Sequence, residues 1–434
     1  MQCRERAMNE KQEKLRTSAG IYTRAVIKWL CVAVVTGALC GVVGTSFHAG
    51  VERATELRMT HPWLHYLLPL LGIPVVWSYK LCRVEGIGTD NILEEVHSGR
   101  GVSLALLPAI FVSTILTHLG GGSVGREGAA LQMGGAIGYQ SARLFRLDES
   151  DKRTTTTIGM AAFFSALFGT PMAATVFAME ITNVGRVYYA QMFPCLVASL
   201  AAYGVTLLMG VAPTAFAVTV PGLEPLMLLR VAILAVLCAY LSVLFCETIH
   251  AVGKQAAKRL PNPWLRAAVG GCAIVLLTHL LGTTDYNGAG MGVIDTAVTR
   301  GIARPEAFAC KLIFTAITLA AGFKGGEVVP SFFVGATFGC LVGPLLGMPA
   351  GFAAAVGLVS VFCGAVNCPL ASTFLALELF GSQGLIYFAM ACTLSFVFSG
   401  YSGIYSSQRI LYDKLKAQYI NVQTNNHYQG SKKE

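Results

Sequence analysis

Charged residues are scarce in this 434-residue chain. Asp, Glu, Lys and Arg together make up 13% of it, whereas soluble domains carry about 25%. So few charges cannot cover the surface of a water-soluble protein of this size. Hydrophobic residues make up 54% of the chain, and the mean hydropathy is +0.60. The composition therefore indicates an integral membrane protein and excludes a soluble globular one.

Metal-binding and redox patterns are also missing. None of the 13 cysteines belongs to a Cys-x-x-Cys pair, and the 8 histidines are scattered. Most of the cysteines fall inside apolar runs, where cysteine is an ordinary small buried residue. There is no nucleophile elbow and no phosphate-binding loop. We therefore expect no metal, no cofactor and no enzymatic activity.

The first 28 residues lack the pattern of a cleavable signal peptide, which joins a short basic region to a short apolar core. They mix basic and acidic residues and predict a cytoplasmic amphipathic helix over residues 1–28. The chain is basic again after Gln408. Because basic flanks mark the cytoplasmic side, we expect both termini inside the cell and the protein in the cell (inner) membrane. This rule accounts for the net charge of +9 without a nucleic-acid partner.

Roughly ten apolar runs approach the ~20 residues that a helix needs to cross the hydrocarbon core. Several are short or interrupted, which predicts tilted and partial helices. The runs are Val26–Phe47, Trp63–Tyr79, Leu104–Leu119, Ile158–Ile181, Met192–Met209, Leu226–Phe245, Ala267–Leu281, Leu312–Gly322, Phe332–Leu346, Phe352–Phe380 and Leu385–Phe398.

Two glycine-rich segments interrupt the apolar sequence at matching places. The first is Gly120–Gly128 (GGGSVGREG) and the second is Gly322–Pro330 (GFKGGEVVP), so that Glu127 and Glu327 lie 200 positions apart. Ionisable residues at membrane depth are costly and indicate function. Gly-interrupted helices at corresponding positions of two halves are the best sequence indication of a transporter's substrate site.

The similarity between the halves extends further. Gly159–Ile181 aligns without gaps to Gly357–Leu379, and Pro62-Trp63-Leu64 recurs at Pro263. These matches predict an internal duplication. If each half holds an odd number of spans, the two lie inverted in the bilayer. We expect a single membrane domain over residues 1–434, made of the N-terminal helix, a first repeat at 29–212, a second repeat at 221–418 and a cytoplasmic tail at 419–434.

Three glycine-bearing breaks are candidates for helix starts that meet at one point. A helix N-terminus has unpaired N–H groups and about half a positive charge, so it binds an anion without a basic side chain. Pro330 also suits the first turn of a helix. The pattern predicts a small-anion site at the membrane midplane. The breaks are Gly86–Gly88, Gly125–Gly128 and Gly325–Gly326, followed by helix-like runs at Asn91–Val96, Ala129–Leu144 and Phe332–Leu346.

Glu127 lies beside this predicted site. A carboxylate and an anion compete for the same N–H groups. A protonated Glu127 side chain swings away from the site, and a deprotonated one occupies it in place of the anion. A single side chain thereby couples the movement of an anion to that of a proton.

These segments resemble those of the CLC family of chloride channels and anion/proton exchangers. Gly125-Arg126-Glu127-Gly128 is similar to the family's Gly-Arg-Glu-Gly-Pro, with Ala129 in place of the proline, and Gly86-Ile87-Gly88 to its Gly-Ser-Gly-Ile-Pro. Gly326–Pro330 resembles Gly-Ile-Phe-Ala-Pro, and Tyr401–Ile404 resembles the Tyr-Ser-x-Ile that supplies a pore tyrosine. The resemblance covers Val26 to about Gln418.

Three departures from the family pattern resemble its fluoride/proton antiporter branch. Ile87 stands where chloride-type members have a serine hydroxyl, and Glu327 replaces the usual isoleucine of the second-half motif. Ile181 stands where the exchangers have their inner proton-transferring glutamate. An aliphatic side chain and a nearby carboxylate would weaken the binding of chloride. Weakening the binding of a competing ion is one route to specificity.

The resemblance implies an all-α integral membrane protein, a CLC-type inverted-repeat bundle of tilted and broken helices, and a homodimer in membrane lipid that exports fluoride in exchange for protons. It implies that Glu127 is the gating carboxylate. The role of Glu327 and the inner proton route stay open. The anion-binding residues that it implies are Gly86, Ile87, Gly88, Gly125, Arg126, Gly128, Gly326, Glu327, Val328 and Tyr401.

Several of these residues also have a purely structural interpretation. Glu127 can pair with Arg126, and Glu327 with Lys324 at a spacing of three residues. Aromatic residues such as Tyr401 and Tyr405 also belong to interfacial belts. Residues for which we favour a structural role are Glu180, Glu378 and His118.

Other transport functions compete with fluoride export. The first alternative is a chloride channel or chloride/proton exchanger of the same fold, against which Ile87 and Glu327 argue. The second is an inverted-repeat transporter for cations or amino acids, which would line its site with carboxylates or unwound carbonyls. The basic neighbours Arg126 and Lys324 speak against a cation site.

Overall fold

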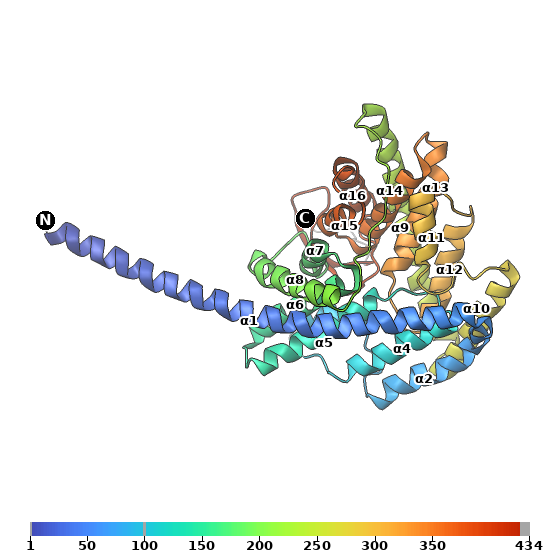
Figure 1. Cartoon of the computed structure of the whole chain (residues 1–434), viewed down its shortest axis with the longest axis horizontal. Coiled ribbons are helices and arrows are strands. Elements are labelled where there is room, and N and C mark those ends of the chain that lie inside the picture. Colours follow the sequence, from blue (N-terminus) through green and yellow to red (C-terminus); the bar gives the residue numbers. More distant parts are fainter. Residues whose placement is uncertain (1, 99–100, 426–434) are drawn as a thin grey trace, which may run out of the picture.

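The computed structural model describes residues 2–98 and 101–425, with side chains from Gly20 onward. Its first helix, α1 (Gln2–Thr60), is one long rod whose N-terminal part projects from the rest of the molecule (Figure 1). The helix predicted over residues 1–28 therefore does not end there but continues through the first apolar run. No proline occurs before Pro62, so nothing in the sequence stops the helix earlier.

Helices make up most of the remaining chain (Figure 1). In chain order they are η1 (Pro62–Leu67), α2 (Leu68–Leu81), α3 (Thr89–Ser98), α4 (Leu106–Gly120), α5 (Glu127–Leu144), α6 (Glu149–Phe168), α7 (Pro171–Glu180), η2 (Tyr189–Gln191), α8 (Met192–Leu208), α9 (Pro225–Arg259), α10 (Pro263–Leu281), α11 (Met291–Asp295), η3 (Thr296–Arg300), α12 (Ala307–Ala320), α13 (Val328–Leu345), α14 (Ala350–Val366), α15 (Pro369–Phe380) and α16 (Leu385–Phe398).

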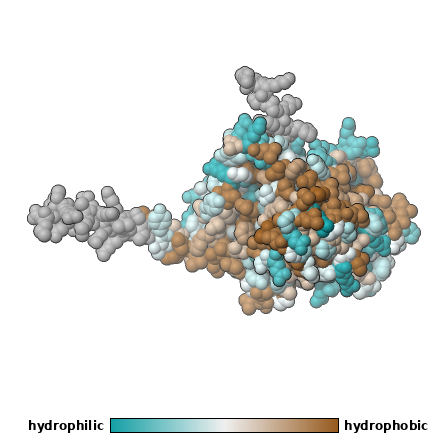
Figure 2. All heavy atoms as spheres, turned by 90° about the horizontal axis from the view of Figure 1, so that it is seen from above, coloured by the Kyte–Doolittle hydropathy of each residue, from teal (hydrophilic) through white to brown (hydrophobic). Residues whose placement is uncertain are grey.

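The surface of the helix bundle is strongly apolar. Within the described part of the chain, five helical stretches are long and apolar enough to cross a membrane, and five shorter helices are apolar. Large side chains such as Leu70, Leu237 and Leu276 are exposed on the outside. Figure 2 shows a broad apolar region across the face in view. The fold is therefore that of an integral membrane protein.

The internal duplication is visible in helix packing. α5 packs against α6 in the first half as α13 packs against α14 in the second. Both pairs cross at glycines: a Cβ on Gly159 would lie 2.0 Å from the carbonyl oxygen of Gly134, and one on Gly357 would lie 2.2 Å from that of Gly335. Only glycine permits backbones to approach this closely.

Two apolar runs that we predicted as continuous are each broken in two. The run Ile158–Ile181 splits after Gly169, which has a φ of +69°, and α7 then starts at Pro171. The run Phe352–Phe380 splits in the same way after Asn367, which has a φ of +56°. In both places a left-handed residue ends one helix and a proline two residues later starts the next.

The two short helices that follow these breaks cap each other. Glu180, the last residue of α7, accepts hydrogen bonds from the backbone N–H groups of Leu370 and Ala371 at 3.3 and 2.9 Å. Glu378 near the end of α15 accepts from the corresponding two N–H groups of α7 at 2.9 and 2.8 Å. Each repeat thus supplies the carboxylate that satisfies a helix start of the other. This confirms the structural interpretation of both glutamates.

A small sheet qualifies the all-α description. β1 (Asn183–Val184) pairs in parallel with β2 (Arg409–Tyr412), which pairs in antiparallel with β3 (Tyr419–Gln423). The predicted boundary between second repeat and tail, at residues 418 and 419, falls between the paired strands β2 and β3. Residues 426–434 of that tail lie outside the described part. The sheet ties the C-terminal segment to the end of α7.

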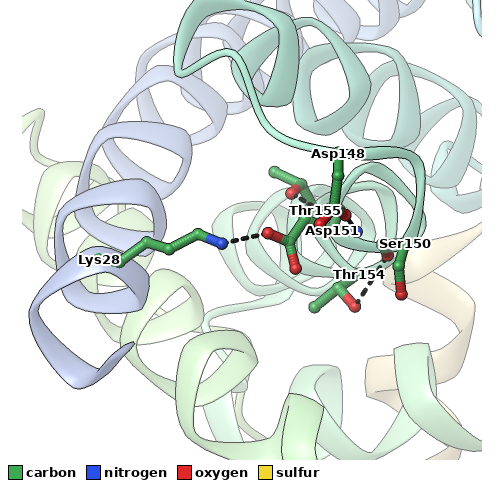
Figure 3. Close-up of polar contacts among 6 residues, drawn as sticks. All are labelled: Lys28, Asp148, Ser150, Asp151, Thr154 and Thr155. Carbon is green, nitrogen blue, oxygen red and sulfur yellow. Dashed lines mark hydrogen bonds and ion pairs between the residues drawn. The ribbon is translucent and has the colours of Figure 1, made fainter. Parts of the chain in front are cut away.

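The N-terminal helix is fixed to the bundle near the point where it meets the other helices. Lys28 on α1 forms an ion pair with Asp151 in the first turn of α6 (Figure 3). Asp148 caps the same helix by accepting a hydrogen bond from the backbone N–H of Asp151 at 2.8 Å. The ion pair is partly exposed, so its contribution to stability is small, but it sets where α1 joins the first repeat.

Candidate functional site

The two glycine-rich segments meet in the middle of the molecule. The backbone N–H of Gly125 donates to the carbonyl oxygen of Gly326 at 2.7 Å, and the N–H of Gly326 donates back at 2.8 Å. These reciprocal bonds form an isolated antiparallel bridge. Corresponding residues of the repeats therefore face each other, as expected for two halves in opposite orientation. The bridge places the starts of α5 and α13 side by side.

Glu127 lies at this junction, at the first residue of α5. Its side chain is completely buried, and its Oε2 atom accepts a hydrogen bond from the backbone N–H of Val329 at 3.2 Å. The carboxylate belongs to the first residue of α5, so it also stands at the start of that helix. The Oε1 atom has no hydrogen-bond partner among the described residues. The carboxylate thus occupies a position where N–H groups of two helix starts converge on a negative charge.

Glycine is required at the bridge because the Glu127 carboxylate lies against the backbone. A Cβ atom on Gly125 would fall 2.1 Å from Glu127 Oε2. One on Gly326 would fall 2.7 Å from the same oxygen and 2.5 Å from the backbone nitrogen of Gly128. The glycine pattern of the two segments is thereby explained by a close approach between chain and carboxylate.

The third glycine-bearing break also reaches this junction. α3 begins at Thr89, whose hydroxyl donates to the carbonyl oxygen of Gly128 at 3.4 Å and accepts from Gln132 Nε2 at 3.1 Å. Ile87, just before α3, is partly buried against the core, and the N–H of Gly88 is bound to the side chain of Asn91 at 2.8 Å. The structure therefore brings the starts of α3, α5 and α13 together.

Neither of the ion pairs considered for the two glutamates forms among the described residues. No Arg126 nitrogen lies within 4.0 Å of the Glu127 carboxylate; the guanidinium contacts the carbonyl oxygen of Leu167 at 3.5 Å. Lys324 instead places its ammonium group 4.2 Å from the ring centre of Tyr79. Glu327 precedes α13, and its Oε2 is buried without a partner in the described chain.

Tyr405, rather than Tyr401, is directed toward the junction. The Tyr401 hydroxyl donates to Asp413 Oδ2 at 2.5 Å, and this bond lowers the pKa of the Asp413 carboxyl. Tyr405 is 2% exposed, its hydroxyl has no hydrogen-bond partner in the described chain, and the acidic groups that act on it are Glu327, Glu127 and Asp90. The position of Tyr401 on the anion path stays a prediction, and its hydroxyl is bound to Asp413 in this structure.

The path of the C-terminal segment explains why Tyr405 is buried near the junction. The backbone N–H and the hydroxyl of Ser407 both donate to Asp90 Oδ1 at the start of α3, at 2.9 and 2.8 Å. Gln408 donates to the carbonyl oxygens of Ile181 and Val366 at 3.0 and 2.8 Å. These long-range contacts turn Tyr405 inward. Tyr405, Thr89 and Gln132 are site residues that we did not predict, because no local pattern marks them.

A large cavity of about 1040 Å³ approaches the junction from the end of α1 opposite the N-terminus. Its wall includes Val329, which binds Glu127, and Arg126, which precedes it. The cavity therefore reaches two residues that neighbour the Glu127 carboxylate.

Comparisons with known proteins agree with this geometry. A family model described as voltage gated chloride channel matches residues 71–400. A chloride/fluoride channel protein of Pseudomonas syringae pv. tomato is 35% identical over 399 residues, which cover 90% of this chain and 88% of that protein.

Two solved structures share the fold. A CLC-type fluoride/proton antiporter has a TM-score of 0.84 at 31% identity, covering 88% of this chain and 98% of that one. A slow cyanobacterial chloride/proton antiporter has a TM-score of 0.73 at 19% identity, covering 86% and 94%, and supports the fold alone. The chain therefore belongs to the voltage gated chloride channel family, the CLC family.

Proposed function

We propose that this protein is a secondary antiporter that exports fluoride in exchange for protons. The observation that carries the proposal is the position of the Glu127 carboxylate, which stands at the start of α5 and accepts a hydrogen bond at the start of α13 from the opposite repeat. A negatively charged oxygen in that position stands in for an anion. Protonation of the carboxylate removes its charge and frees the N–H groups for fluoride, so one residue alternates between the two ions.

The choice of fluoride rests on the residues around the junction and on similarity to relatives. Ile87 brings no hydroxyl donor to the start of α3, and Glu327 adds a carboxyl beside the site. Two relatives that are at least 30% identical are described as a chloride/fluoride channel protein and a CLC-type fluoride/proton antiporter. Fluoride enters cells as the neutral acid and is trapped as the ion, so a proton-driven exporter relieves its accumulation.

The remaining binding residues are proposed from their positions. Gly125, Gly128 and Gly326 permit the close approach at the bridge, and Val328 begins α13. Gly86, Ile87 and Gly88 lead into α3, Arg126 lies on the cavity side, and Glu327 and Tyr405 lie beyond Glu127. We further propose that the protein is a homodimer in the cell (inner) membrane with both termini in the cytoplasm.

The test is fluoride efflux from proteoliposomes, followed with a fluoride electrode while proton movement is recorded in parallel. Fluoride efflux coupled to proton uptake into the vesicles, with little chloride movement under the same gradient, is the expected result. Efficient chloride transport would instead place the protein with the chloride channels and exchangers. No anion movement of either kind would contradict the proposal as a whole.

Replacing Ile87 with serine is expected to reduce discrimination against chloride. The new hydroxyl would lie before α3, where it can donate to an anion larger than fluoride, and a hydrogen bond to a charged group is worth about a tenfold change in preference. The ratio of fluoride to chloride transport rates measures the effect. Ile302→Ser, an exposed residue on the wall of the large cavity, is the matched control; equal ratios in both variants would mean that Ile87 does not select the anion.

A further inference from the structure

Buried basic side chains that form no ion pair lie at and beside the large cavity. Arg58, near the end of α1, is 9% exposed, and His118 on α4 is completely buried; both line the cavity together with Arg126. The Arg58 guanidinium lies close to Gly288, whose carbonyl oxygen accepts a hydrogen bond from Lys311 at 2.6 Å. We call Arg58, His118, Arg126 and Lys311 the outer basic cluster.

None of these groups forms an ion pair with an acidic side chain of the described chain. In the described chain, every ion pair within 4.0 Å involves other residues. Lys311 donates to the carbonyl oxygens of Tyr286 and Gly288 at 3.2 and 2.6 Å, and Arg126 contacts only a carbonyl at 3.5 Å. A buried charge without a partner is strongly unfavourable. The cluster therefore lacks a negative charge that would complete it.

Two of its nitrogen atoms are also without hydrogen-bond partners in the described part of the protein. One is a terminal guanidinium nitrogen of Arg58, which lies close to Gly121 and Gly288. The other is His118 Nε2. The His118 Nδ1 atom is bound to the carbonyl oxygen of Thr114 at 2.9 Å and must donate there. Nε2 consequently becomes a second donor when the ring is protonated, which an anion nearby would favour.

Acidic residues occur in this cavity only at its rim. Glu52 and Glu56 are exposed, and Glu52 pairs with His48 at 2.9 Å. Asp285 pairs with Arg304 at 3.6 Å, and both side chains are largely exposed. The acidic residues that line the cavity are therefore exposed ones, whereas Arg58, His118 and Arg126 are buried.

We propose that the outer basic cluster is a second anion-binding site, which holds one small monovalent anion between the cavity and Glu127. Arg58 provides the main contact, and protonated His118 and Arg126 complete the charge. The identity of the anion as fluoride rests on the proposed function, whereas the site itself rests on the two buried nitrogen atoms of Arg58 and His118 that have no hydrogen-bond partner in the described chain. An exported ion would pause here after leaving the helix starts, because Arg126 and Val329 connect the cavity to the junction.

The proposal is tested by counting fluoride ions bound to the purified full-length protein by isothermal titration calorimetry, with sodium fluoride and then sodium chloride as titrant. The wild type should bind two fluoride ions per subunit. Arg58→Met should bind one, with affinity for the lost ion reduced about tenfold or more. Arg304→Met removes the same charge from the rim of the same cavity and should bind two.

A structural role for Arg58 predicts a different result. Loss of a purely structural arginine would lower the melting temperature without fluoride, whereas removal of an unpaired buried charge should not, and should only reduce the stabilisation that fluoride adds. If Arg58→Met does not fold, Arg58→Gln replaces it, because glutamine removes the charge but keeps amide donors. Wild-type binding stoichiometry in whichever variant folds would overturn the proposal.

The outcome is separable from that of the proposed function. If the wild type transports only chloride, and chloride binding depends on Arg58, the second site stands and the fluoride assignment fails. If fluoride transport is proton-coupled but the wild type binds a single ion that Arg58→Met retains, the transport function stands and the second site is rejected.

Discussion

Proton-coupled fluoride transport should fall by about 100-fold or more in Glu127→Gln, the range typical of removing a proton-transferring group. Glutamine keeps the shape of the side chain and fills the same buried space between α5 and α13. Its amide can neither bind nor release a proton and no longer carries the charge that the helix starts attract. Fluoride movement driven by a pH gradient across proteoliposomes measures the loss.

Glu56→Gln provides the comparison for this variant. Glu56 is exposed at the rim of the cavity that leads to Glu127, so its replacement removes a carboxylate on the same path without touching the helix starts. Its transport should remain within about twofold of the wild type, because an isolated exposed charge contributes little. Coupled transport at the wild-type rate in Glu127→Gln would show that the gating carboxylate lies elsewhere.

Replacing Gly326 with alanine should abolish transport for a geometric reason. The added methyl group would lie 2.5 Å from the backbone nitrogen of Gly128 and 2.7 Å from both the nitrogen and Oε2 of Glu127. Overpacking of this kind costs about 1–3 kcal/mol. Because the backbone on both sides has little room to move, we expect the Gly125–Gly326 bridge to break and the Glu127 carboxylate to be displaced from its position. We expect a transport rate below about one tenth of the wild type.

Gly204→Ala separates this effect from the general cost of altering a membrane glycine. Gly204 lies in α8, and a Cβ there would meet nothing within 4 Å. The variant should transport normally and be as stable as the wild type. Size-exclusion chromatography confirms that both variants fold, and efflux assays then compare them. Normal efflux in Gly326→Ala would mean that the glycine bridge is not part of the transport path.

Helix starts at the junction could be predicted from sequence, because glycine, charge and proline leave a local signature. We expected helices after the breaks at Gly86–Gly88, Gly125–Gly128 and Gly325–Gly326, and the structure begins α3, α5 and α13 there. The internal duplication can also be predicted from the sequence, because it leaves matching residues at a nearly constant offset.

Features that depend on distant parts of the chain escaped prediction. Tyr405 is turned inward by contacts of Ser407 with Asp90, 317 positions earlier, so no local pattern distinguishes it from Tyr401. The breaks at Gly169 and Asn367 did carry a local signal in the proline that follows each. The uninterrupted apolarity of both runs, however, favours a single continuous helix over a break at the proline.

The bonds between the repeats limit how this transporter can expose its site to the two sides of the membrane. Many inverted-repeat transporters do so by rocking one half against the other as a rigid body. Here such a motion would break both hydrogen bonds of the bridge and the four that Glu180 and Glu378 make across the repeats. Each broken buried bond leaves groups unsatisfied at about 1–3 kcal/mol. We therefore expect the halves to move little against each other, and we expect access to the site to alternate through side chains such as Glu127.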